Sequence, residues 1–138
     1  MRRGGWLHED SGPAHRRPAH RRMPVERRSI THKAHIHSPD GEFTFYIIAG
    51  MYEDGTLGEV FVRGIGKEGS TIQGLLDAWA CQFSIGLQHG ASLGMMARKF
   101  AHMKFPPYGT TDDPSVPECD SPIDYIVRWL DSFAGLRR

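Results

Sequence analysis

Apolar and polar positions alternate along three stretches in the first half of the chain, at residues 29–36, 43–52 and 58–65. Alternation with a period of two is typical of strands that bury one face. The stretches are separated by the turn signatures SPDG at 38–41 and EDG at 53–55, in which Pro and Gly favour reversal of the chain. Three strands joined by short turns predict an antiparallel meander.

After residue 71 the apolar spacing becomes helical, with positions i, i+3, i+4 and i+7 forming one broad stripe. The positions are Ile72, Leu75, Leu76, Trp79, Phe83 and Leu87. Such a stripe predicts a helix that covers one face of the sheet, because a small sheet alone buries too little surface to be stable. His89 and Gly90 are expected to end this helix, and Cys81 is expected to be a small core residue.

Two further helices are predicted downstream. Ser92 can cap a helix over residues 93–103, and Ser121 followed by Pro122 is a favourable start for the last helix. The proline-rich segment 105–120 between them predicts a long loop. The predicted fold class is therefore α+β, an antiparallel three-stranded meander followed by three helices packed on one face.

Charge is distributed unevenly along the 138 residues. Residues 1–33 hold nine Arg and Lys against three Asp and Glu, whereas residues 34–138 hold eight against thirteen. The first segment has few apolar residues and several Gly and Pro, which predicts a disordered basic arm over residues 1–25 and a single domain over 26–136. The arm could bind nucleic-acid phosphates, or it could be a solvated tail with no specific partner. The arginines concerned are Arg16, Arg17, Arg21, Arg22, Arg27 and Arg28.

The best anion-site candidate is the segment KEGST at residues 67–71, where extended chain should become helix. The first N–H groups of a helix have no intrahelical acceptor, and Ser70 or Thr71 can cap one of them while others stay available. Gly69 gives the turn its freedom, and Arg63 and Lys67 would add positive charge. The alternative is that the capping serves only the helix.

Other candidate chemistry is weaker. His32, His35 and His37 form H-x-x-H-x-H, but no carboxylate or cysteine completes a metal site at a recognisable spacing, so no metal site is predicted. Cys81 and Cys119 form no C-x-x-C pair, and Cys119 is kept only as a possible redox residue. No apolar run is long enough for a membrane span, and no signal peptide is recognisable, so a cytoplasmic protein is expected.

Five blocks of this sequence, in this order, resemble one known segment. They are ERRSITHKAHI (26–36), GMYEDGTLGEVFVR (50–63), KEGSTIQGLLDAWACQFSIGLQHGASL (67–93), ARKFAHMKFPPYGTT (97–111) and SPIDYIVRWL (121–130). The segment is the C-terminal, TSCPD-type domain of class II, cobalamin-dependent ribonucleotide reductases, which also occurs in small stand-alone proteins. The TSCPD motif itself is poorly matched around Cys119.

The resemblance implies a link to deoxyribonucleotide synthesis. Reductases of this class use a catalytic barrel that carries a radical cysteine, a reducing cysteine pair and adenosylcobalamin. None of these is expected within this chain, so no catalytic residue and no directly bound cofactor are assigned. The leading hypothesis is a non-catalytic accessory or regulatory domain that binds a class II reductase, itself or a nucleotide.

Two alternatives remain open at this stage. The first is an independent binder of nucleotides or other phosphate ligands at the KEGST helix start, and the second is a nucleic-acid binder that uses the arginine-rich arm. Self-association into a homo-oligomer is expected under all three hypotheses, because the small sheet has exposed edges.

Overall fold

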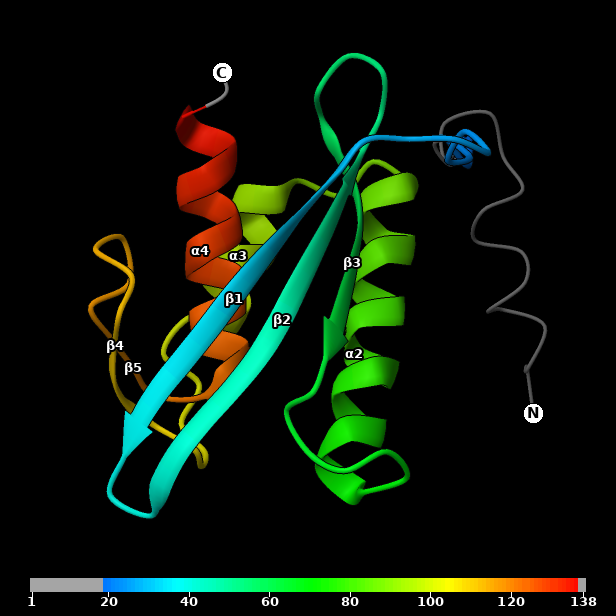
Figure 1. Cartoon of the computed structure of the whole chain (residues 1–138). Coiled ribbons are helices and arrows are strands. Elements are labelled where there is room, and N and C mark those ends of the chain that lie inside the picture. Colours follow the sequence, from blue (N-terminus) through cyan, green and yellow to red (C-terminus); the bar gives the residue numbers. More distant parts are fainter. Residues whose placement is uncertain (1–18, 137–138) are drawn as a thin grey trace, which may run out of the picture.

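The structure is a computed structural model that describes residues 19–136 (Figure 1). Strands and helices follow one another in the order β1 (Ser29–Ser38), β2 (Gly41–Met51), β3 (Leu57–Arg63), α2 (Thr71–Gln88), α3 (Leu93–Phe100), β4 (Gly109–Thr111), β5 (Glu118–Cys119) and α4 (Pro122–Leu136). The predicted α+β class is confirmed, and each of the three predicted strands and three predicted helices is present. Within the described chain, no helix combines the length and the apolar character needed to cross a membrane.

The sheet is larger than the predicted meander. Its five strands lie in the order β3-β2-β1-β4-β5, and every neighbouring pair is antiparallel. Segment 105–120, predicted as loop throughout, supplies β4 and β5, and β4 pairs with the far end of β1. Strands of three and two residues are too short to show a period, so the prediction of loop was wrong where distant pairing orders the chain.

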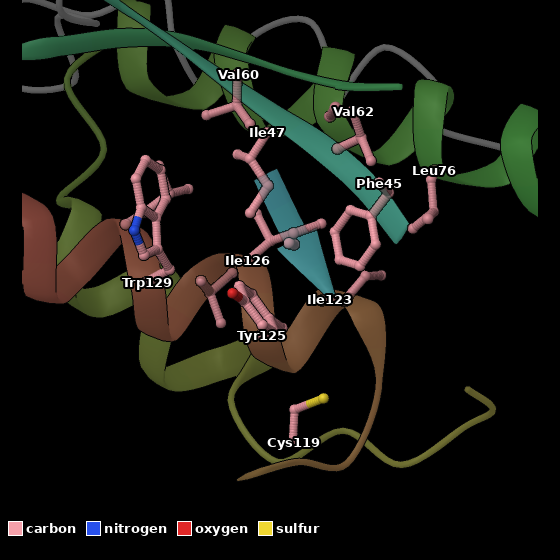
Figure 2. Packing of buried hydrophobic residues seen from close by; sticks show 14 of the residues in the cluster. Phe45, Ile47, Val60, Val62, Leu76, Cys119, Ile123, Tyr125, Ile126 and Trp129 are labelled. Atoms are coloured by element: carbon pink, nitrogen blue, oxygen red, sulfur yellow. The ribbon is translucent and has the colours of Figure 1, made fainter. Parts of the chain in front are cut away.

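One face of the sheet carries the core (Figure 2). Alternate residues of the three long strands point to this face, as their register requires: Phe45 lies opposite Ala34, and Ile47 lies opposite Val62. Tyr125 and Ile126 of helix α4 face these strand residues (Figure 2), and Leu130 belongs to the same core cluster; all three are buried. Burying each large apolar side chain contributes on the order of 1.5–3 kcal/mol, so this layer dominates stability.

Helix α2 runs beside β3 at the edge of the sheet (Figure 1). Its polar side chains form hydrogen bonds with backbone N–H and carbonyl groups of β3 that have no neighbouring strand to pair with. Nε2 of Gln73 donates to the carbonyl of Val62 at 3.0 Å, Oγ of Ser84 accepts from the N–H of Val60 at 2.9 Å, and Nε2 of Gln88 donates to the carbonyl of Gly58 at 3.0 Å. The helix thus blocks an edge that could pair with another chain.

The opposite face of α2 is exposed, which corrects one expectation. Cys81, predicted as a core residue, is exposed, and so are Leu75 and Ile85. The reason is that α2 packs against the edge of the sheet through Leu76, Ala80 and Phe83, so Leu75, Cys81 and Ile85 have no layer to meet within the described chain. Helix α3 also ends earlier than predicted, at Phe100.

Residues 19–25 of the predicted arm contact the body. The N–H of Arg21 donates to the carbonyl of Gln88 at 2.8 Å, the carbonyl of Arg21 accepts from the hydroxyl of Tyr52 at 2.6 Å, and the ring of His20 stacks on that of His89. The contacts of the domain therefore begin before the predicted boundary at residue 26. The rest of the predicted arm, residues 1–18, lies outside the described residues.

Candidate functional site

The KEGST segment starts helix α2, as predicted. Thr71 is the first helical residue, and Ser70 is the N-cap, whose Oγ accepts from the N–H of Gln73 at 3.3 Å. Gly69 has φ +82°, a left-handed conformation that suits glycine. The N–H of Ser70 closes the turn by donating to the carbonyl of Lys67 at 2.9 Å. The N–H groups of Ser70 and Gln73 are thus both occupied, and anion binding at this helix start stays a prediction.

The side chain of Arg63 is already engaged by other groups. Its Nη1 lies 3.0 Å from its own neighbour's carbonyl, at Val62, and 3.3 Å from Oδ1 of Asp77. Asp77 also accepts from Nε2 of Gln73 at 2.8 Å. Both charged side chains of the Arg63–Asp77 pair are about half exposed, so the pair contributes little to stability. Its effect is to place a carboxylate next to one of the two cations proposed for the anion site.

The three histidines of H-x-x-H-x-H separate onto the two faces of β1. His32 lies on the core face, where its ring stacks on Trp129 with centroids 4.5 Å apart and its Nε2 lies 2.9 Å from the hydroxyl of Tyr125. Burial lowers the pKa of His32, and the nearby carboxylate of Asp113 opposes this effect. His32 is therefore part of the packing of α4 on the sheet.

His35 and His37 lie on the outer face and share one carboxylate. Nε2 of His35 is 3.0 Å from Oε2 of Glu42, and Nδ1 of His37 is 2.8 Å from the same oxygen. Nε2 of His37 meets Oδ1 of Asp112 at 2.7 Å. Hydrogen bonds with Asp112 and Glu42 raise the pKa of His37, and His37 in turn lowers the pKa values of both carboxyl groups.

The acidic members of this cluster, Glu42 and Asp112, were not predicted from the sequence. Glu42 lies directly across the β1–β2 hairpin from His37. The SPDG turn at 38–41 contained the signal, because a two-residue turn fixes which residues face each other. No sequence signal placed Asp112, which follows β4 and reaches His37 only through the pairing of β4 with β1.

Cys119 lies in the short strand β5 and belongs to the buried core (Figure 2). Its side chain is buried, and burial raises the pKa of the thiol to about 11. The thiolate is the reactive form, and it is scarce at neutral pH for such a group. This environment disfavours the redox role considered for Cys119.

Two of the arginines proposed to contact nucleic acid are engaged by carboxylates of the domain. Nη2 of Arg21 lies 2.9 Å from Oδ2 of Asp54, and Arg27 bonds both oxygens of Glu59 at 2.7 and 2.9 Å. Arg16 and Arg17 lie outside the described residues, whereas Arg22 and Arg28 are exposed. A phosphate would compete with Asp54 or Glu59 for Arg21 and Arg27.

An exposed apolar surface crosses from the sheet to α2. Tyr46 and Phe61 project from the outer face of β2 and β3, each about two-fifths exposed, and Ile85 projects from the exposed side of α2. Phe61, Cys81 and Ile85 line one groove along the edge of β3. We refer to Tyr46, Phe61, Cys81 and Ile85 as the outer apolar surface.

The sequence profile of the TSCPD domain matches residues 16–134, which include every strand and nearly all of α4. The chain belongs to the TSCPD domain family. The match begins ten residues before the predicted domain start, in agreement with the contacts that residues 19–25 make in the structure.

Curated relatives of this TSCPD domain are large proteins named vitamin B12-dependent ribonucleotide reductase. The protein from Rhodopirellula baltica is 40% identical over 114 residues, covering 83% of this chain and 10% of the relative. The protein from Streptantibioticus cattleyicolor is 41% identical over 114 residues, or 18% of its length. That from Bradyrhizobium diazoefficiens is 33% identical over 110 residues, or 8% of its length.

The chain therefore spans less than a fifth of the length of these relatives and is a ribonucleotide reductase-related domain. No solved structure matches it.

Proposed function

We propose that this TSCPD domain is a non-catalytic binding domain of the ribonucleotide reductase system, which docks onto a vitamin B12-dependent ribonucleotide reductase. The observation that carries the proposal is that the relatives contain this domain as a small part of a much longer chain. Some 114 residues of this chain align with segments that make up about a tenth to a fifth of reductases bearing that name. A domain within a longer chain packs against its neighbours, so an interface with the remaining reductase is expected.

The outer apolar surface is the best candidate for this interface. Phe61 and Ile85 belong to different elements, line the same groove and are exposed, and Arg63 and Asp77 form an ion pair at its edge. Aromatic and aliphatic side chains surrounded by polar residues are typical of protein–protein contacts. A reductase is favoured as the occupant because the relatives carry this domain and the rest of the enzyme in one chain.

Binding should be tested with charge substitutions on this surface. Phe61→Glu and Ile85→Glu should abolish association with the vitamin B12-dependent reductase of the same organism, measured by calorimetry or co-purification of the two purified proteins. Met95→Glu is the matched control, because Met95 is equally exposed but lies on α3. Reductase activity and effector response should be recorded with and without the domain.

The outcomes distinguish docking itself from the surface that would carry it. Loss of binding in both surface variants and retention in the control would support the proposal. The proposal fails if the wild-type domain does not bind the reductase. If all three variants bind like the wild type, the outer apolar surface is excluded as the interface. Concentration-dependent self-association of the wild type that both surface variants lose would assign the surface to a second copy instead.

The second candidate function is binding of a phosphate-containing ligand at the start of α2. It is favoured by the confirmed N-cap at Ser70, by the left-handed Gly69 and by Lys67 beside them. Calorimetry with a panel of nucleotides and inorganic phosphate tests it, with Lys67→Ala as the disabling variant and Lys104→Ala as the control. A flat response across the whole panel would end this hypothesis.

Nucleic-acid binding through the arginines of the predicted arm is the third candidate and has less support. Arg21 and Arg27 would have to leave Asp54 and Glu59 to contact phosphates. Deleting residues 1–25, which removes Arg16, Arg17, Arg21 and Arg22, should abolish any salt-sensitive DNA binding of the full chain. Unchanged binding after the deletion would exclude that segment as the contact.

A further inference from the structure

We propose that His35, His37 and Glu42 form a binding site for a divalent transition-metal ion, with Zn²⁺ as the best fit, on the outer face of the β1–β2 hairpin. This proposal is independent of docking to a reductase. It reverses the expectation from the sequence, which found no carboxylate at a recognisable spacing from the histidines.

Strand geometry explains why the three side chains meet. His35 and His37 are two residues apart on β1, so both point to the same face. The register of the hairpin pairs His37 with Glu42 and His35 with Thr44, which places Glu42 on that face too. Side chains on facing residues of antiparallel strands lie about 4.5–5.5 Å apart at Cβ, close enough to share one ion.

The distances suit a small cation. Nε2 of His35 and Nδ1 of His37 lie 3.0 and 2.8 Å from Oε2 of Glu42, and the ligand atoms all lie within 4.8 Å of one another. Zinc binds imidazole nitrogen and carboxylate oxygen at about 2.0–2.2 Å in a tetrahedron, which puts neighbouring ligand atoms about 3.3 Å apart. To reach this spacing, each nitrogen needs to move away from Oε2 of Glu42 by only a few tenths of an ångström.

Both imidazoles are supported on their other nitrogen. Nδ1 of His35 lies 2.8 Å from Oγ1 of Thr44, and Nε2 of His37 lies 2.7 Å from Oδ1 of Asp112. Histidines that bind metals usually donate the second ring N–H to such a group, which fixes the ring and its tautomer. Here a different partner serves each ring, and the nitrogens left over are the two that face Glu42.

The pairing of β4 with β1 positions Asp112 beside the ring of His37. Strand β4 pairs Thr110 with His37, and Gly109, at φ +154°, lies so close to the carbonyl of His37 that a Cβ there would collide with it. Glycine at position 109 therefore allows β4 to approach the end of β1. Asp112 follows directly and meets the ring of His37.

A second cluster in the described chain shows the contrast. His102, Asp120 and Asp124 also lie near one another, but both oxygens of Asp124 already accept backbone N–H groups, from His102 at 2.6 Å and Asp120 at 2.8 Å. The Asp124 carboxylate therefore stabilises the local backbone and is not free to bind a metal ion. Glu42 is exposed, and within residues 19–136 its carboxylate hydrogen-bonds to the two imidazoles and to no other group.

The ligand chemistry selects the ion. Two imidazoles and one carboxylate favour Zn²⁺, Co²⁺, Ni²⁺ or Cu²⁺ over Mg²⁺ and Ca²⁺, which prefer oxygen ligands. Three protein ligands leave one position of a four-coordinate ion open. Water or another ligand can reach this position because Glu42 and His37 face solvent. The negative charges of the Glu42 and Asp112 carboxylates balance the two positive charges of the metal ion.

The test is metal binding by the full, untagged chain after removal of metals with a chelator. Calorimetry with ZnCl₂ should show one site per chain, and CoCl₂ should give the visible absorption of a four- or five-coordinate ion. Zn²⁺ should raise the melting temperature, whereas MgCl₂ should not. A His35→Ala/His37→Ala double variant and Glu42→Gln should lose the site, and Asp112→Asn should weaken it by about 10–100-fold.

Two controls separate this site from the other histidines. His89→Ala, an exposed histidine outside the cluster, should bind Zn²⁺ like the wild type, as should a variant with alanine at the three early positions His8, His15 and His20. Each variant should keep the metal-free circular dichroism spectrum of the wild type. The proposal is overturned if the double variant, folded by that criterion, still binds Zn²⁺ with wild-type affinity, or if the wild type binds none.

Discussion

The hydroxyl of Ser84, in the middle of α2, accepts a hydrogen bond from the backbone N–H of Val60 at 2.9 Å and lies 3.3 Å from the carbonyl of the same residue. It also donates to the carbonyl of Ala80, one turn back in the helix, at 2.7 Å. A helix side chain thus takes the place of the next strand at the edge of the sheet. This relationship explains why the serine hydroxyl is buried between α2 and β3.

Replacing Ser84 should therefore destabilise the domain. In Ser84→Ala the buried N–H of Val60 loses its partner, which costs about 1–3 kcal/mol in the free energy of unfolding. Urea denaturation followed by circular dichroism measures the change. Gln82→Ala, on the exposed side of the same helix, should change it by less than about 0.5 kcal/mol. Equal effects of the two substitutions would contradict this role.

Asp124 should be a larger determinant of stability. Its carboxylate is fully buried, accepts the N–H groups of His102 and Asp120, and lies 3.1 Å from Nη1 of Arg128. Removing one partner of a buried ion pair costs about 3–5 kcal/mol, and the partial exposure of Arg128 puts Asp124→Ala near the lower limit. Thermal and urea unfolding should show this loss, while Asp131→Ala, on the exposed side of α4, should be neutral.

Stability should fall in mild acid because of His32. Its pKa in the folded state is lowered by burial from an ordinary value near 6.5, so below that pH the unfolded chain takes up a proton more readily than the folded chain does. The stabilisation is present above pH 6.5 and is lost as the pH falls towards the folded-state pKa. His37, whose pKa is raised, contributes in the opposite sense, since its share is lost as the pH rises above 6.5.

Substitution of each histidine separates their contributions to the pH dependence of stability. Urea unfolding at pH 7.5 and pH 5 should show that His32→Gln loses less stability on acidification than the wild type does, whatever its stability at pH 7.5. His37→Gln should lose more. A wild-type pH dependence in His32→Gln would show that His32 titrates alike in the folded and unfolded chains.

The two cysteines should differ strongly in reactivity. Cys81 is exposed, whereas Cys119 is buried with a pKa of about 11, so at pH 8 only about a thousandth of Cys119 is thiolate. Iodoacetamide at pH 8 should add a single label to the native chain, and intact mass spectrometry of Cys81→Ser should show almost none over the same time. Rapid labelling of Cys81→Ser would mean that strand β5 opens readily.

The amino-acid sequence alone determined where most elements begin and end. Ser70, Ser92 and Ser121 mark the helix starts, Gly90 follows the end of α2 in a left-handed conformation, and the alternation in β1 to β3 sorts core from surface. These signals are local, because caps, turns and periodicity act within a few residues. The five-block resemblance to class II reductases likewise agrees with the family and relatives found by comparison.

Tertiary structure alone decided how distant segments meet. It added β4 and β5 to the sheet, exposed Cys81, turned the polar side of α2 towards the edge of β3, and brought Asp112 to a histidine 75 residues away. Short strands and shared side-chain clusters have no local signal, since their stability comes from partners far along the chain. Local sequence signals thus specify the long strands and the helices, and the pairing of β4 with β1 completes the cluster around His37.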